Sequence, residues 1–178
     1  MTGIIPFAPL VSDAAAVGAG AVCGALCRHH IGKAATERIA KDPQNLKHLT
    51  GWHTAGINIL GSFILGSVFA TPVINPAITE VIQKTPPVKI KSAATKVVSP
   101  SSPPTSFLVG MTPRMKLLAG VGFCGSFTTF STFSVDLVNM IGKGELVKAS
   151  SYLMVNNVGG VLAAAAGMMV AKRFYGIR

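Results

Sequence analysis

Charged side chains are scarce in this chain of 178 residues, because only 12% of its residues are Asp, Glu, Lys or Arg and only six are acidic. Its mean hydropathy is +0.53. Soluble globular domains usually carry about 25% charged residues around one apolar core. The composition therefore excludes an ordinary soluble domain and indicates a membrane protein.

The sequence also lacks the residue groupings on which most enzymes depend. Its apolar runs contain no paired carboxylates, no Ser, His and Asp set for a triad, and no His and Cys at metal-ligand spacing. The three cysteines do not suggest a disulfide framework, since Cys23 and Cys27 lie one helical turn apart and Cys124 lies in another apolar run. We interpret the cysteines as packing residues, and nothing in the sequence supports an enzyme.

Four apolar runs are candidates for membrane-spanning helices, each of which needs about 20 mostly apolar residues. They cover residues 11–30, 52–71, 114–142 and 147–171. The first is the weakest, because the stretch between Asp13 and Arg28 is short and rich in Ala and Gly, so it spans only if flanking side chains snorkel. We expect an all-α membrane protein with four transmembrane helices in one domain, residues 1–178.

Residues 72–113 interrupt this pattern between the second and third runs. Eight of the eleven prolines of the chain lie there, beside Ser, Thr and Lys. Segments of this composition cannot build a packed core. We expect a flexible loop whose apolar pieces are too short to span a bilayer.

The 16 basic residues give a formal net charge of +10, but they are spread over the connections and the ends of the chain. Contact with anionic lipid headgroups explains this pattern better than binding to nucleic acid, which needs one basic patch. With four spans, one side of the membrane holds Arg28, Lys33, Arg38, Lys41, Lys47, Lys143 and Lys148, and the other holds Lys84, Lys89, Lys91, Lys96, Arg114, Lys116, Lys172, Arg173 and Arg178. This nearly even split is a weak orientation signal, so we expect that the chain inserts in both orientations.

Two of the runs carry polar residues at helical spacing. Thr54, Asn58 and Ser62 follow one another at i, i+4 steps, and Tyr152, Asn156 and Gly160 repeat this spacing in the fourth run. A polar stripe within a bilayer must face protein or water. Asn58 alone could simply hydrogen-bond a neighbouring helix, but the complete stripe favours a functional role.

Residues 122–134 of the third run read Gly-Phe-Cys-Gly-Ser-Phe-Thr-Thr-Phe-Ser-Thr-Phe-Ser and predict an interrupted helix. In a bilayer, irregular backbone survives only where it faces protein or water, so the break predicts a site. Phe127, Phe130 and Phe133 recur at every third position among hydroxyl residues, and Phe130 and Phe133 should share a face if the helix resumes after the break. Because aromatic rings have positive edges, we expect a path for a small anion here. Asp136 is the one acid inside this run, and such a residue is functional or partnered by default.

These motifs resemble those of the CrcB/Fluc family of fluoride channels, whose eukaryotic relatives are called FEX. The resemblance rests on residues 24–28 (Gly-Ala-Leu-Cys-Arg), on residues 58–66 (Asn-Ile-Leu-Gly-Ser-Phe-Ile-Leu-Gly) and on the stretch 122–134. It implies four transmembrane helices per subunit with a broken third helix, and an antiparallel, dual-topology homodimer with two separate pores. It also implies passive, fluoride-selective conduction.

The resemblance also assigns roles to particular residues. Phe130 and Phe133 would line the fluoride path, and Asn58 would reach towards it. The polar groups beside the rings would be Ser131, Thr132, Tyr152 and Asn156. Relatives commonly have Ser or Thr one and two turns after this Tyr, whereas this chain has Asn156 and then Gly160, which carries no donor.

A structural Na⁺ ion at the centre of the dimer is a further implication of the resemblance. Backbone carbonyls of Gly125 and Thr128 from each subunit would hold it, and oxygen ligation without side-chain charge suits a hard monovalent cation. Arg28 and Asp136 would support the pore, Arg28 as an anchor at the end of the first span or as an electrostatic funnel. Asp136 stands where the family usually has Glu.

We therefore expect a fluoride channel in the cell membrane that lets fluoride leave passively and protects the cell from its toxicity. Two alternatives stay open on the sequence alone. A small proton-coupled exporter of the multidrug type is also short and four-helical, and it would need Asp136 as its titratable carboxylate. A non-conducting membrane scaffold would explain the glycines but not the alternation of Phe with Ser and Thr.

Overall fold

The computed structural model describes residues 7–74 and 110–177, and the regular elements in these two ranges are all helical. Four helical segments in them are long and apolar enough to cross a membrane: Val11–Lys41, Trp52–Ala70, Pro113–Gly142 and Leu146–Tyr175. The prediction of an all-α membrane protein with four spans is therefore confirmed.

The spans contain the following elements. The first span is α1 (Phe7–Lys41), which α2 (Pro43–Leu46) and η1 (Lys47–Leu49) connect to the second, α3 (Trp52–Ala70). The third comprises α5 (Pro113–Lys116), a π-helical segment η3 (Leu117–Cys124), α6 (Gly125–Phe127) and α7 (Phe130–Gly142). The fourth comprises α8 (Leu146–Met154), a π-helical segment η4 (Val155–Gly159) and α9 (Gly160–Tyr175).

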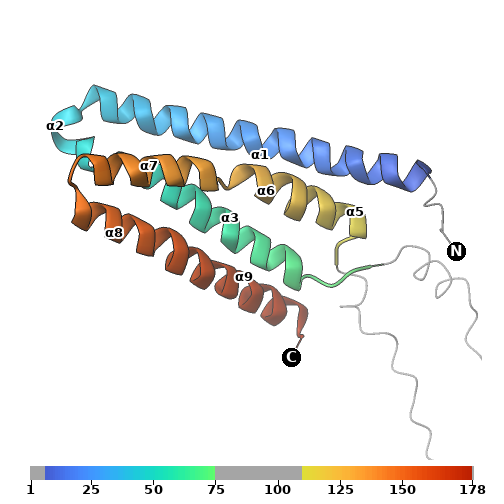
Figure 1. Cartoon of the computed structure of the whole chain (residues 1–178). Helices are drawn as coiled ribbons and strands as arrows, with labels where there is room; N and C mark the ends of the chain where they lie inside the picture. Colours follow the sequence, from blue (N-terminus) through green and yellow to red (C-terminus); the bar gives the residue numbers. More distant parts are fainter. Residues whose placement is uncertain (1–6, 75–109, 178) are drawn as a thin grey trace, which may run out of the picture.

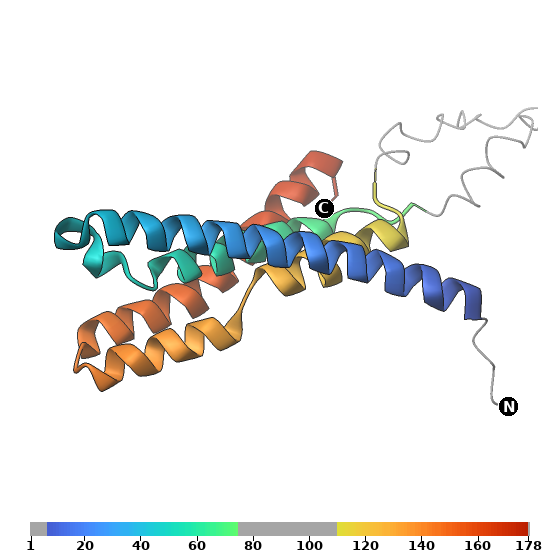
Figure 2. The same ribbon diagram turned by 90° about the horizontal axis from the view of Figure 1, so that it is seen from above.

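Consecutive spans run in opposite directions, so α1 begins and α9 ends at the same end of the bundle (Figure 1). In this view α1 and the fourth span lie at opposite edges, and α3 and the third span lie between them. Seen from above, α7 and α8 lie together and diverge from α1 and α3 (Figure 2). The third span therefore changes neighbours along its length, with its first half against α1 and its second half beside α8.

The first span is longer than its composition suggested. Although Arg28 ends the uncharged stretch, α1 continues for more than three turns beyond it to Lys41. Arg28 therefore does not lie at the end of its helix, and its place at the edge of the membrane stays a prediction. Cys23 and Cys27 are exposed on α1, so the prediction of packing residues holds only for the buried Cys124.

Small residues let the helix backbones approach one another closely. A Cβ atom added at Gly66 of α3 would collide with the carbonyl oxygen of Ala164, and one at Gly167 of α9 would collide with the carbonyl oxygen of Phe63. Gly20 of α1 similarly lies against the backbone of the third span. Close packing through small residues is typical of membrane helices, because lipid provides no hydrophobic force between them.

The described ends of the expected loop at residues 72–113 are hydrogen-bonded to each other. The N–H of Ile74 donates to the carbonyl oxygen of Met111 over 3.0 Å, and the N–H of Met111 donates to that of Pro72 over 2.9 Å. These bonds hold the end of the second span beside the start of the third. Residues 75–109 lie outside the described residues, so the expected flexibility of the loop stays a prediction.

Candidate functional site

The third span breaks where the sequence predicts, between α6 and α7. Thr128 and Thr129 have extended backbone angles, with ψ of 154° and 114°, so no α-helix passes through them. The hydroxyl of Thr129 accepts a hydrogen bond from the N–H of Thr132 over 3.2 Å and caps α7. Ser and Thr compete with the helix by bonding the backbone in this way, which explains a break at a run of hydroxyl residues.

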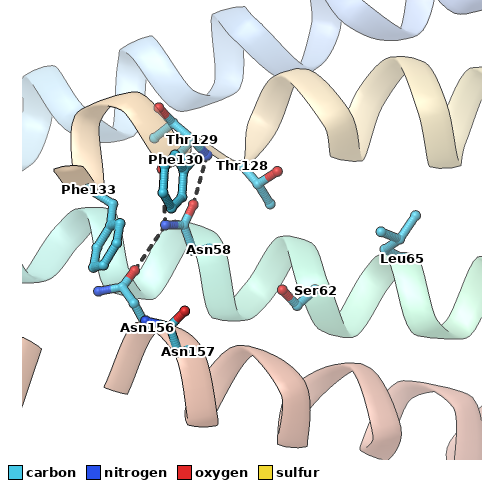
Figure 3. A pocket seen from close by; sticks show the side chains of 9 residues that line it. All are labelled: Asn58, Ser62, Leu65, Thr128, Thr129, Phe130, Phe133, Asn156 and Asn157. Atoms are coloured by element: carbon cyan, nitrogen blue, oxygen red, sulfur yellow. Dashed lines mark hydrogen bonds between the residues drawn. The ribbon is translucent and has the colours of Figure 1, made fainter. Parts of the chain in front are cut away.

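Asn58 of α3 holds the broken backbone with both ends of its amide (Figure 3). Its Oδ1 accepts from the N–H of Thr129 over 2.8 Å, and its Nδ2 donates to the carbonyl oxygen of Thr129 over 3.2 Å. Its Nδ2 also donates to Oδ1 of Asn156 over 2.9 Å. Asn58 thereby joins three spans at the level of the break.

The break redirects two N–H groups away from helical carbonyls. In a continuous helix the N–H of Thr129 would donate to the carbonyl oxygen of Gly125, and that of Thr132 to the carbonyl oxygen of Thr128. Here these N–H groups donate to Asn58 and to the Thr129 hydroxyl instead. The carbonyl oxygens of Gly125 and Thr128 are thus released from the helical pattern.

Phe130 and Phe133 begin α7 directly after the break, and their ring centroids lie 5.6 Å apart. Phe133 is only 5% exposed and packs against the ring of Tyr152 at 5.4 Å. Phe130 is 77% exposed. The expectation that the two rings share a face is confirmed, although only one of them is covered within a single chain.

A cavity of about 230 Å³ opens beside the break (Figure 3). Polar and aromatic groups from α3, the third span and η4 line it: Asn58, Ser62, Leu65, Thr128, Thr129, Phe130, Phe133, Asn156 and Asn157. The cavity thus brings together four of the residues expected along the anion path, which are Asn58, Phe130, Phe133 and Asn156. It contains no charged side chain, so an ion inside it would be held by dipoles and ring edges.

The other three residues expected along the path lie outside this cavity. Tyr152 is fully buried behind Phe133. Thr132 lies on the far side of Thr129, whose hydroxyl donates to that of Thr132 over 3.0 Å. Ser131 is exposed, and its hydroxyl lies 3.2 Å from that of Thr129. The structure places all three next to the cavity walls, and their contact with an ion stays a prediction.

Asp136 is partnered, as expected of an acid inside a span. Its Oδ2 accepts from the hydroxyl of Thr54 over 3.0 Å and from that of Tyr152 over 3.1 Å. It also lies beside Gly51, where α3 begins, and the positive end of a helix stabilises a carboxylate. Asp136 therefore ties α7 to α3 and α8, and it does not line the cavity at the break.

A second cavity of about 220 Å³ lies on the other side of Thr129. Its lining includes four basic or titratable side chains, which are Arg28, His29, Lys33 and His53, together with Thr54, Thr129 and Thr132. Because Thr129 lines both cavities, they flank the same break. Arg28 therefore lies where an electrostatic funnel would be useful, although not at the end of its helix.

Three polar residues of the cavity at the break, Ser62, Thr129 and Asn157, were not among the residues expected along the anion path or at the metal site. Ser62 belongs to the polar stripe of α3, which already indicated it. Thr129 is a residue that the N-cap preference of threonine could have identified. Asn157 follows Asn156 directly in the π-helical segment η4, and both residues line the cavity. The π-helical winding has no sequence signal here.

Comparison with known proteins settles the family. The model of the family described as CrcB-like protein, Camphor Resistance (CrcB), matches residues 15–168, which include the second and third spans and most of the first and fourth. The chain belongs to the CrcB family. The match covers both cavities and the break between α6 and α7.

Individual members of the CrcB family are similar over most of their length. A fluoride-specific ion channel FluC of Gloeobacter violaceus is 29% identical over 163 residues, which are 92% of this chain and 98% of that protein. FluC 1 of Parasynechococcus marenigrum is 31% identical over 87% of this chain and 90% of its own. A FluC of Leptospira interrogans is 31% identical over 69% and 71%.

Proposed function

We propose that this CrcB-family chain forms a fluoride-selective ion channel. The observation that carries the proposal is the uncharged cavity at the break of a membrane span, where Phe130 and Phe133 face Asn58 and Asn156. The names of the similar proteins from three bacteria agree with this assignment. No observation in the described residues favours the exporter, because Asp136 is held by two hydroxyls away from the cavity.

Dehydration is the physical problem that such a path must solve. Fluoride binds water strongly, so it enters a narrow path only where other positive groups replace that water. The ring edges of Phe130 and Phe133 and the polar side chains that line the cavity provide such groups. They carry no fixed charge, and a fixed charge would trap the ion. A narrow path of such groups would accept fluoride and reject the larger chloride.

The ion moves down its electrochemical gradient in this proposal, since the cavity offers no titratable group for coupling to protons. We place the channel in the cell membrane, where passive efflux lowers the internal fluoride concentration. The basic cavity with Arg28, Lys33 and His53 then raises the local concentration of anions next to the break. Its biological effect is resistance to fluoride toxicity.

The working unit is an antiparallel homodimer in this proposal. Phe130 lines the cavity but is 77% exposed, so the wall on its side is incomplete in a single chain. A second copy can cover this ring and close the path. The even distribution of basic residues between the two ends supports insertion in both orientations, which an antiparallel dimer requires.

A structural Na⁺ ion at the dimer centre fits the backbone at the break. The carbonyl oxygens of Gly125 and Thr128 have lost their helical partners, and carbonyl oxygens are suitable ligands for a hard cation. Gly125 is exposed, and a Cβ added there would meet no atom within 4 Å, which leaves room for a second copy. Two copies would supply four carbonyl oxygens, and the bound ion would favour anions nearby.

The experiment that tests the channel is fluoride efflux from liposomes that contain the purified chain, read with a fluoride electrode. We expect rapid efflux without a proton gradient and little chloride movement under the same conditions. Liposomes without protein are the control. A folded protein that releases no fluoride, or releases it only with a proton gradient, would overturn the proposal.

Orientation is tested separately by labelling. Lys143→Cys, in a variant whose native cysteines are replaced, places one thiol in the turn between α7 and α8. We expect a membrane-impermeant reagent to label about half of the copies in intact cells, and all copies after lysis. Labelling of all copies, or of none, in intact cells would exclude dual topology.

Sodium binding is tested by stability. The purified protein should unfold at a higher temperature in Na⁺ than in an equal concentration of N-methylglucamine, because a ligand that binds only the folded state stabilises it. Equal unfolding temperatures in the two salts would contradict the Na⁺ site while leaving the channel proposal intact.

A further inference from the structure

The amide of Asn58 has no donor to spare for an ion in this structure. A side-chain amide has two N–H hydrogens. Those of Asn58 donate to the carbonyl oxygen of Thr129 and to Oδ1 of Asn156. Asn58 lines the cavity, but its hydrogen bonds hold the break in place, so the anion needs a donor from another residue of the cavity.

Most hydroxyls of the cavity also donate their hydrogen to another group of the protein. Thr128 donates its hydroxyl to the carbonyl oxygen of Cys124 over 2.9 Å, and Thr129 donates to the hydroxyl of Thr132 over 3.0 Å. Three hydroxyl residues line this cavity, Ser62, Thr128 and Thr129, and within the described part of the chain Ser62 is the one whose hydroxyl makes no hydrogen bond. It is therefore available to an ion in the cavity.

Ser62 faces a position of the fourth span that has no side chain, Gly160. Gly160 is buried and has no side chain, and a Cβ atom added there would have the Ser62 hydroxyl oxygen as its nearest neighbour, at 3.5 Å. The space next to the hydroxyl is therefore set by the absence of a side chain at position 160. Ser62 also lies one helical turn beyond Asn58 on the same face of α3, so it continues the path away from the break (Figure 3).

We propose that Ser62 is an anion ligand of the pore, and that its hydroxyl provides the hydrogen-bond donor that Gly160 cannot provide from the fourth span. The inference rests on the proposed channel function and adds a second binding position to it. An ion that leaves the level of Phe130 and Phe133 exchanges ring edges for the Ser62 hydroxyl. Hydroxyl donors form short, strong bonds with a small hard anion such as fluoride, so this position also contributes to selectivity over chloride.

An isosteric pair of variants isolates the hydroxyl from the volume of the side chain. Ser62→Thr keeps the hydroxyl donor, and we expect near-parental efflux from it. Ser62→Val places a side chain of nearly the same shape as threonine at this position, without the hydroxyl. We expect a loss of about tenfold or more from the second, since hydrogen bonds to charged groups are strong. Ser151→Ala on α8, an exposed serine that lies outside the cavity, is the matched control and should conduct like the parent chain.

A rescue experiment tests the relation to Gly160. Adding Gly160→Ser to Ser62→Ala places a hydroxyl on the opposite wall of the same space, and a Cβ there makes only ordinary contacts. We expect the single variant Ser62→Ala to lose fluoride efflux and the double variant to regain it, with the fluoride-to-chloride ratio changing in parallel. Size-exclusion chromatography and circular dichroism establish that each variant is folded.

The outcomes separate this inference from the proposed function. If the parent chain conducts fluoride and Ser62→Val conducts equally well, Ser62 is not a ligand and the inference fails, while the channel stands. If Ser62→Ala loses efflux and Gly160→Ser does not restore it, the assignment of both residues to one position is wrong. If the folded parent chain does not conduct, the channel proposal itself fails.

Discussion

Asn58 and Thr129 are joined by a pair of hydrogen bonds, from the Thr129 N–H to Oδ1 over 2.8 Å and from Nδ2 to the Thr129 carbonyl oxygen over 3.2 Å. The side-chain amide thus replaces the backbone partners that Thr129 would have in a continuous helix. An interruption inside a bilayer survives only with such compensation, because an unsatisfied polar group there costs several kcal/mol. The pair explains how a span can break and remain stable.

Asn58→Asp should therefore abolish fluoride efflux. A carboxylate can accept from the N–H of Thr129, but it cannot donate to the carbonyl oxygen of Thr129 or to Asn156, and its charge repels an anion in the cavity. We expect roughly 1–3 kcal/mol of lost stability for the unsatisfied groups. Efflux and thermal unfolding measure the two effects. Asn139→Asp makes the same change on the exposed surface of α7 and should alter neither the fluoride efflux nor the unfolding temperature. Normal efflux from Asn58→Asp would refute the role of Asn58.

Phe130→Ile should stop efflux without unfolding the chain. The ring is 77% exposed in a single chain, so its loss removes little packing within that chain. The aliphatic side chain has no positive ring edge for an anion. Phe174→Ile near the end of α9 is the control, because that ring is 76% exposed and lies far from the cavity. Equal efflux from the two variants would show that the Phe130 ring is dispensable.

Sequence reasoning predicted the four spans and the broken helix because both depend on local composition. Apolar runs determine the spans, and a cluster of Gly, Ser and Thr weakens the third helix locally. The length of α1 beyond Arg28 could not be predicted in this way. The residues after the apolar run are helical but not apolar, so the search for apolar runs did not detect them. Sequence spacing predicted that Phe130 and Phe133 share a face, but not that only Phe133 is buried.

The functional hydrogen bonds of the site were beyond prediction for a different reason. Asn58 bonds Thr129, which lies 71 positions away in the sequence, and Asn156, which lies 98 positions away. The i, i+4 rule placed Asn58 and Ser62 on one face, but it could not show that Asn58 uses its donors internally. It also could not show that Asn157, in the π-helical segment η4, lines the same cavity.

Asp136→Asn distinguishes the channel from a proton-coupled exporter. Asparagine can still accept from the hydroxyls of Thr54 and Tyr152, so we expect the variant to fold, with a stability loss of roughly 1–2 kcal/mol from weaker, uncharged hydrogen bonds. Fluoride efflux should persist in the variant and should be independent of an imposed pH gradient in both proteins. Efflux that needs a proton gradient in the parent chain and disappears in Asp136→Asn would instead establish the exporter.

Gly66→Ala should destabilise the bundle because the backbones of α3 and α9 meet at this position. The added Cβ would collide with the carbonyl oxygen of Ala164, which is backbone and cannot rotate away, so the two helices must separate. Overpacking of this kind costs roughly 1–3 kcal/mol.

Gly56→Ala on the same helix is the matched control, since a Cβ there meets nothing within 4 Å and alanine favours the helix by about 1 kcal/mol. The unfolding temperature in detergent should therefore fall for Gly66→Ala and should stay the same or rise for Gly56→Ala. Equal shifts in the two variants would mean that the close approach of α3 and α9 does not hold the bundle together.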